Sequence, residues 1–410
     1  MNPESDVKKI LNRRRFMTFE HAMIGPDHNN GWSWAADNLA GIPAITRVLI
    51  TLYRSGVKRV ILPAEAHSIR WVVDIWRKKK TMPQIFWEEH PSTAGFDLLY
   101  VRGGILFEPR LIQWLKQAAR EFPTGNICVT GRNDRFLLAV FRGSDDPKQH
   151  PLHLPPEKIF SQRPVSDVSA PDELFYRSIA ELKTAGNGRD LLAMVGKPDE
   201  AGHVKWIRDK TFPLIRFLSE TSISPNQLTW FGFLLGIAGA FFIAEGEYGY
   251  GVLGALLLCG SWILDGMDGT LARLTFSESP HGAALDTTLG HLTNIVFFIS
   301  LVWAVYGNAS LLTAGFFIFL VTASIAVAHR VCQAEGRLRK GTNPDRQIRR
   351  VQVFLEQIHG RDFAVLVLLF ALFDGFKFFL WVCMAGIQAF WMVHLWLIRK
   401  HRKYRRASIS

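Results

Sequence analysis

The second half of the chain contains repeated apolar runs of the length that crosses a lipid bilayer. A helix needs about 20 apolar residues to span the hydrocarbon layer, so each such run is a candidate membrane span. Six runs follow one another, at about 228–244, 248–265, 287–306, 309–328, 363–374 and 376–398. The fifth run is short, and it is either a re-entrant piece or a helix that extends back through Ile358. The sequence therefore predicts an all-α domain of six transmembrane helices.

The first half is mixed and charged, and with 410 residues the chain is long enough for two domains. Apolar residues recur at helical spacing between Pro43 and Ser55, Gly56 stops the pattern, and Val57–Leu62 reads as a strand. The alternation continues with helices at Ile69–Arg77 and Pro109–Arg120, and with strands at Leu98–Val101, Ile127–Thr130 and Phe136–Phe141. This order predicts an α/β domain with a largely parallel, Rossmann-type sheet. Residues 143–175 are expected to form a long surface excursion, followed by a helix at about Glu173–Thr184.

These patterns divide the chain into four parts. Residues 1–196 form the α/β domain, and residues 226–400 form the six-span domain. Residues 197–225 are a linker that includes a basic, aromatic helix from His203 to Thr221, which we expect to lie in the membrane interface. Residues 401–410 form a basic tail.

The basic residues predict the orientation in the membrane. Lysine and arginine gather in segment 331–362 and after Ile398, whereas the turns near Glu247, Gly307 and Asp374 hold almost none. The positive-inside rule then places both termini in the cytoplasm, as in a multi-pass protein of the cell (cytoplasmic) membrane. The net charge of +12 is explained by this topology, and no nucleic-acid partner is predicted. The four cysteines have no CxxC spacing, which supports neither a zinc site nor a disulfide framework.

The stretch that carries chemistry joins the second and third apolar runs. It reads Asp265-Gly-Met-Asp268-Gly269-Thr-Leu-Ala272-Arg273, then eight residues, then Gly282-Ala-Ala-Leu-Asp286. Asp265 and Asp268 lie one helical turn apart on one face, and Asp286 on the next helix can close the cluster. Carboxylates at a membrane boundary need a partner, and oxygen-only ligands favour Mg²⁺ or Mn²⁺ bound against a substrate phosphate. The pattern indicates phosphoryl-transfer chemistry.

This stretch resembles the signature of the CDP-alcohol phosphotransferase family, D-x2-D-G-x2-A-R-x8-G-x3-D-x3-D, in type and spacing through Asp286. Ser224-Pro225-Asn226-Gln-Leu-Thr229, before the first span, is also similar to that family. The resemblance implies that Asp265, Asp268 and Asp286 hold the metal. It also implies that the CDP group contacts Asp265, Gly269, Ala272, Arg273 and Gly282.

One position departs from the family pattern. The resemblance implies a fourth aspartate that deprotonates the acceptor alcohol, and here that position is Gly290. His291 stands beside it and an imidazole could serve as a substitute base, but one residue along a helix turns a side chain by about 100°. The alternative is that His291 packs between helices.

The front domain is similar to nucleotidyltransferases of the kind fused ahead of these enzymes, as in inositol-phosphate cytidylyltransferase fusions. The similarity lies in Asn38-Leu-Ala-Gly41-Ile-Pro43 and in the run from Asp97 to Arg110. No glycine-rich G-x-G-x-R loop precedes Asn38, and Arg102 stands where that family has a metal-binding aspartate. We therefore expect a degenerate domain with a structural or ligand-sensing role.

The resemblance implies a membrane enzyme of phospholipid biosynthesis. It would transfer a substituted phosphate group from a CDP-linked alcohol or lipid, such as CDP-diacylglycerol, to a hydroxyl acceptor and release CMP. Membrane lipids are its surroundings, and the resemblance also allows a homodimer. The alternative is a pseudoenzyme that binds CDP-lipid as a scaffold or sensor, because Gly290 replaces the base.

Overall fold

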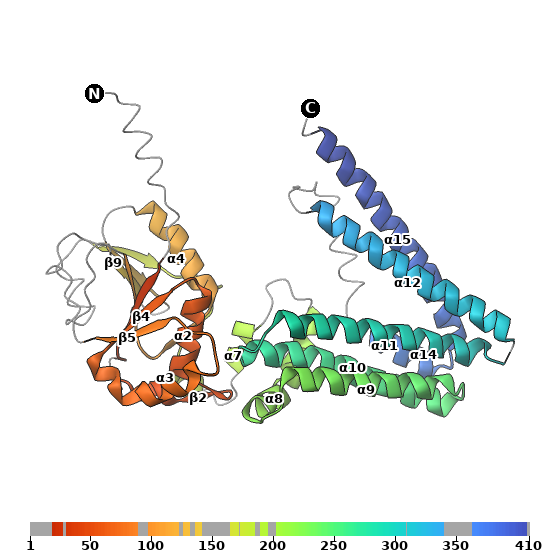
Figure 1. Ribbon diagram of the computed structural model, residues 1–410, viewed down its shortest axis with the longest axis horizontal. Coiled ribbons are helices and arrows are strands. Elements are labelled where there is room, and N and C mark those ends of the chain that lie inside the picture. Colours follow the sequence, from red (N-terminus) through yellow and green to blue (C-terminus); the bar gives the residue numbers. More distant parts are fainter. Residues whose placement is uncertain are drawn as a thin grey trace. The chain divides into compact units, whose positions relative to one another are not determined.

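The chain forms two compact units in a computed structural model (Figure 1). The described residues are 19–27, 30–88, 97–122, 126–131, 136–141, 165–171, 173–184, 189–195, 202–308, 310–339 and 363–407. The first unit comprises residues 1–196 with 219–221 and 274–276, and the second comprises residues 197–218, 222–273 and 277–410.

The first unit is built on a seven-stranded mixed sheet. Its order is β10 (Val165–Ser169), β8 (Asn126–Thr130), β9 (Phe136–Phe141), β6 (Leu98–Val101), β1 (His21–Ile24), β4 (Arg59–Pro63) and β5 (Gln84–Glu88). β9 is antiparallel to both β6 and β8, and the other neighbouring pairs are parallel. β6 and β9 are buried along their whole length, as central strands covered on both faces must be. The α/β prediction is confirmed, whereas this mixed order does not establish a Rossmann-type sheet.

Helices and short strands complete the first unit. The helices are α2 (Ala44–Arg54), α3 (Arg70–Arg77), α4 (Pro109–Glu121), α6 (Ile179–Thr184) and α7 (Arg189–Val195), with 3₁₀ turns η1 (Ser33–Ala36) and η2 (Ala64–Ile69). The short strands pair as β2 (Asn38–Leu39) with β3 (Ile42–Pro43) and as β7 (Ile105–Phe107) with β11 (Tyr176–Ser178). The fully buried Arg47 on α2 is satisfied locally, because its Nε donates to the Leu39 carbonyl at 2.9 Å.

Two sequence predictions in this unit are wrong in part. Residues 165–169 were expected in a surface excursion, but they form β10, an edge strand parallel to β8. The helix expected at about 173–184 is confined to α6, because residues 176–178 pair with β7 as β11. Both segments become strands because their backbones pair with strands that are distant in the sequence. The local spacing of apolar residues does not reveal such pairing.

The second unit is helical. It contains α8 (Gly202–Glu220), α9 (Pro225–Ala244), α10 (Tyr248–Leu274), α11 (Pro280–Tyr306), α12 (Leu311–Arg339), α14 (Phe363–Leu372) and α15 (Phe376–Ala407). α9 packs along α11 and α12 packs along α15, while α10 contacts α9 (Figure 1). The core that these helices share includes Leu258, Phe297, Val321 and Leu380.

Four of the described helices are long and apolar enough to cross a membrane, namely α9, α10, α11 and residues 376–400 of α15. The apolar part of α12, Leu311–Ser324, and the ten residues of α14 are shorter. The extension of the fifth run through Ile358 lies outside the described residues. Six spans therefore stay a prediction, while the membrane character of the second unit is supported.

Glycines let α9 and α10 approach closely. A methyl group added at Gly239 on α9 would lie 2.7 Å from the carbonyl oxygen of Gly254 on α10. Nearer to the aspartate motif, the hydroxyl of Ser261 on α10 donates to the Gly232 carbonyl on α9 at 2.7 Å. Small residues at a membrane-helix interface permit this backbone contact, so the two helices are held in a fixed register up to the aspartate motif.

Candidate active site

The aspartate motif lies at the end of α10 and the beginning of α11, within the second unit. Asp268 is buried, with 4% of its surface exposed, and Asp265 lies half-buried one turn earlier on α10. Asp286 lies half-buried in the second turn of α11. Burial of an ionised carboxylate in an apolar helix bundle is costly without a partner.

A partner for Asp268 comes from α9. The hydroxyl of Thr229 donates to Asp268 Oδ2 at 2.5 Å, which is the length of a hydrogen bond to a charged acceptor. Thr229 is itself buried, with 8% of its surface exposed. The carboxylate is thus held in one orientation by a neighbouring helix.

The rest of the α10 segment presents small residues and one cation. A methyl group at Gly269 would lie 3.5 Å from Nη1 of Arg273, so the guanidinium lies back along its own helix. Nη2 of Arg273 lies 3.3 Å from the hydroxyl of Thr270 and donates to it. Ala272 is half-buried on the same segment. Arg273 can offer positive charge to a phosphate beside Gly269.

The first turn of α11 brings Gly282 close to α9. Ser279 caps the helix, because its hydroxyl accepts from the Gly282 N–H at 3.0 Å, and Pro280 follows at the first helical position. A methyl group at Gly282 would lie 3.0 Å from Oδ1 of Asn226 on α9. A side chain larger than glycine would therefore require Asn226 and Ser279 to shift by a few tenths of an ångström.

The region after Asp286 is open. A methyl group at Gly290 would meet no atom within 4 Å, so this face of α11 has room for a larger side chain. His291 is exposed on α11, and its two expected roles, substitute base or packing between helices, stay predictions. Its side chain is turned away from the position of Gly290 by the helical step.

The donor chemistry of the motif fits a divalent cation. Asp265, Asp268 and Asp286 supply hard oxygen ligands, and the Asp268 carboxylate is buried. Within the described residues, no group of three or more His, Cys, Asp or Glu side chains is arranged to hold a metal ion. Because like charges repel, three carboxylates close only around a cation, and their joint coordination stays a prediction.

Thr229 and Asn226 were not singled out by sequence reasoning as site residues. Both belong to the run 224–229 that was noted only for its family resemblance. Thr229 is a polar residue at the start of an apolar helix, but its contact with Asp268 is known only from the packing of α9 against α10. The position of Asn226 beside Gly282 is likewise known only from the structure.

In the first unit, the ends of β1 and β6 meet around an ion pair. Nη2 of Arg102 lies 3.7 Å from Oδ1 of Asp27, and its Nη1 donates to the Phe136 carbonyl at 3.3 Å. A methyl group at Gly103 would lie 2.4 Å from the Gly25 carbonyl oxygen, so the two strand ends are tightly packed. Asp27 therefore offsets the charge of Arg102, while the buried Nε of Arg102 has no hydrogen-bond partner among the described residues.

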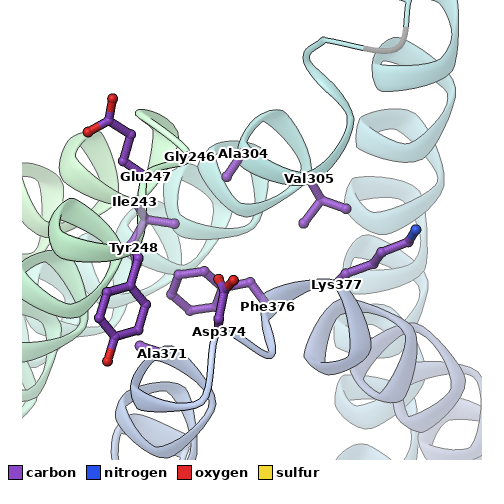
Figure 2. Close-up of a pocket in the computed structure, with 10 residues that line it drawn as sticks. All are labelled: Ile243, Gly246, Glu247, Tyr248, Ala304, Val305, Ala371, Asp374, Phe376 and Lys377. Carbon is purple, nitrogen blue, oxygen red and sulfur yellow. The ribbon is translucent and has the colours of Figure 1, made fainter.

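A pocket of about 220 Å³ lies at the other end of the helices of the second unit (Figure 2). It is lined by residues from the α9–α10 turn, the end of α11 and the α14–α15 turn, including Glu247, Tyr248, Asp374 and Lys377. Asp265 follows Tyr248 on α10 by 17 residues, or about 26 Å at 1.5 Å per residue. The pocket is therefore separate from the aspartate motif.

The fold and the motif together define a helical unit with four apolar candidate membrane spans, one buried carboxylate and two half-buried ones. Residues 222–387 match the family model described as CDP-alcohol phosphatidyltransferase. The match covers this domain and not the whole chain, and it confirms the resemblance inferred from the sequence. Members of the family are membrane transferases that act on CDP-alcohols and are generally dependent on divalent metals.

Curated relatives share parts of this domain. An archaetidylinositol phosphate synthase of Pyrococcus horikoshii is 32% identical over 121 residues, which are 29% of this chain and 58% of the relative. An uncharacterized protein of Aquifex aeolicus is 31% identical over 126 residues, or 30% of this chain and 61% of the relative. A bifunctional IPC transferase and DIPP synthase of Rubrobacter xylanophilus is 43% identical over 72 residues, or 18% of this chain and 16% of the relative. The chain thus spans less than two thirds of each relative's length.

Among solved structures, the crystal structure of HddC from Yersinia pseudotuberculosis aligns with 43% of this chain and 98% of its own. The sequence identity is 11% and the TM-score is 0.29. Similarity at this level carries no argument about function.

Proposed function

We propose that this protein transfers a substituted phosphate group from a CDP-linked lipid, such as CDP-diacylglycerol, to a hydroxyl acceptor and releases CMP. The observation that carries the proposal is the buried carboxylate Asp268 on α10, held by Thr229. It stands within a complete D-x2-D-G-x2-A-R-x8-G-x3-D spacing. The match to the CDP-alcohol phosphatidyltransferase family over residues 222–387 supports the same reaction class.

In this proposal the motif residues divide into two groups. Asp265, Asp268 and Asp286 hold a divalent cation, Mg²⁺ or Mn²⁺, which when bound neutralises charge on the pyrophosphate. Arg273 adds a positive charge at the same helix end. The small residues Gly269, Ala272 and Gly282 leave room for the CDP group. Asp265 also contacts the CDP group in this proposal. The acceptor hydroxyl attacks the phosphorus that bears the lipid, the bond to CMP breaks, and the hydroxyl proton leaves to a base or to water.

The placement in the membrane follows from the same elements. With both termini in the cytoplasm, the α10–α11 motif faces the leaflet where CDP-linked lipids are made available to cytoplasmic acceptors. The exposed Trp206, Leu214 and Phe217 give α8 an apolar face suited to the membrane interface, with Lys210 beside Trp206.

A pseudoenzyme that binds CDP-lipid without turnover is the second candidate, and Gly290 favours it. The missing carboxylate removes the family's base, whose help is worth about 10²- to 10⁴-fold in rate. The candidate for a substitute base is His291, which is exposed on α11 one residue after Gly290.

The test is an assay of the purified full-length protein with Mg²⁺ or Mn²⁺, CDP-diacylglycerol and a panel of alcohols. CMP release is expected, with loss in Asp268→Asn and a decrease in His291→Ala. The variant Gly290→Asp is informative because its side chain meets open space. If no acceptor gives CMP above background but Gly290→Asp does, the pseudoenzyme reading holds. If neither protein releases CMP, the enzymatic proposal is wrong.

A further inference from the structure

The first turn of α9 is built more firmly than an exposed helix start requires. Ser224 and Gln227 form a reciprocal cap, in which the Gln227 N–H donates to the Ser224 hydroxyl at 3.3 Å and the Ser224 N–H donates to Gln227 Oε1 at 2.8 Å. Pro225 occupies the first helical position, where its fixed φ suits the helix. The start of α9 is therefore rigid.

This turn projects Thr229 onto the aspartate motif. A hydroxyl carries one proton, and two acceptors lie in reach of Thr229: the Pro225 carbonyl at 3.1 Å and Asp268 Oδ2 at 2.5 Å. The shorter contact is to a charged oxygen, and hydrogen bonds to charged acceptors are about twice as strong as neutral ones. The hydroxyl of Thr229 therefore donates its hydrogen bond to Asp268 and not to the Pro225 carbonyl.

The same turn also reaches the other half of the motif. Oδ1 of Asn226 lies 3.0 Å from the position of a methyl group at Gly282, in the first turn of α11. One short segment of α9 thus contacts both motif helices, α10 through Thr229 and α11 through Asn226. A segment in this position can fix the carboxylates of the two helices relative to each other.

We infer that Thr229 is a positioning residue, which orients the Asp268 carboxylate for a divalent cation through its hydrogen bond to Oδ2. The inference rests on the proposed function, in that it assigns Asp268 to the cation. Groups that hold a metal ligand in place typically change metal affinity or activity by about 10- to 100-fold when they are removed. The hydroxyl, rather than the volume of the side chain, carries the effect.

The experiment is a Mn²⁺ titration of the purified full-length protein by electron paramagnetic resonance, with CMP release measured beside it. Thr229→Val is expected to weaken Mn²⁺ binding by about tenfold or more. Thr229→Ser and Thr229→Ala lose the same methyl group and differ in the hydroxyl, so a tighter Mn²⁺ affinity in the serine variant isolates the hydrogen bond. This pair also serves if the valine variant fails to fold.

The matched control is Thr293→Val. Thr293 is equally buried on α11, donates to the Leu289 carbonyl at 3.0 Å, and packs against α9 at Gly236. Mn²⁺ affinity in this variant is expected to stay within about threefold of wild type, because Thr293 donates to a backbone carbonyl and not to a motif carboxylate.

The outcomes separate the inference from the proposed function. If Asp268→Asn loses Mn²⁺ binding while the serine and alanine variants at Thr229 bind it equally, the positioning role is refuted and the proposed function stands. An equal loss in Thr229→Val and Thr293→Val would also refute it, because the effect would be general packing. If the wild type neither binds Mn²⁺ nor releases CMP, the proposed function fails and the inference fails with it.

Discussion

The contact between Gly239 and Gly254 gives a prediction whose magnitude follows from geometry. A methyl group at Gly254 would lie 2.5 Å from the Gly239 carbonyl oxygen and 2.7 Å from Cγ1 of Ile243. Carbon and oxygen atoms approach to about 3.3 Å at closest, so Gly254→Ala forces α9 and α10 apart by about 0.8 Å. A side-chain rotation can move Ile243 Cγ1, but it cannot relieve the contact with the Gly239 carbonyl oxygen, which belongs to the backbone.

Overpacking of this kind costs about 1–3 kcal/mol, but alanine also favours a helix over glycine by about 1 kcal/mol. Gly386→Ala in the interior of α15 provides the matched control, since a methyl group there meets nothing within 4 Å. Both variants gain the same helix propensity when alanine replaces glycine. Their difference in stability therefore reports the overlap between α9 and α10.

The assay is thermal unfolding of both variants in the same detergent. A domain of this size shifts by about 2–4 °C per kcal/mol, so Gly254→Ala is expected to unfold about 2–12 °C below Gly386→Ala. The reasoning would be refuted by equal midpoints, or by a Gly254→Ala protein that is the more stable of the two.

Three further predictions concern single groups. Arg47→Met should lower the free energy of unfolding by about 2–3 kcal/mol, because the Leu39 carbonyl loses a charged donor. Denaturant titration of the full chain measures this change, and an unchanged midpoint would contradict it. Burial, with the charge of Asp167, raises the pKa of the Cys128 thiol to about 12, so iodoacetamide at pH 8 should label it only after denaturation, as mass spectrometry of the peptide would show. Ser224→Ala should cost about 1 kcal/mol by loss of the α9 cap, and a thermal midpoint equal to that of the wild type would argue against the cap.

Much of the architecture follows from local patterns. Helical spacing before Ser55, together with Gly56, predicts α2 and β4, and the strand at Leu98–Val101 agrees in both bounds. β1, β5 and β10 were missed because short strands take their pairing from distant segments, and nothing within Val165–Ser169 records its neighbour β8. Apolar length locates the helices of the second unit, but it does not fix how many of them cross the membrane.

The candidate site divides in the same way. The spacing of Asp265, Asp268 and Asp286 is a local pattern, so the sequence identifies these residues as candidates directly. The contact of Thr229 with Asp268 joins two helices and 39 positions, and no periodicity indicates it. The open space at Gly290 likewise depends on how α11 packs, which the sequence does not state.

The central claim is that motif carboxylates hold a divalent cation against the pyrophosphate of a CDP group. Electron–nuclear double resonance of the wild-type protein with Mn²⁺ and a CDP-alcohol tests this contact directly. We predict phosphorus couplings to the bound Mn²⁺ in the wild type and their loss in Asp268→Asn. Bound Mn²⁺ without phosphorus coupling, or coupling that survives in Asp268→Asn, would contradict the account.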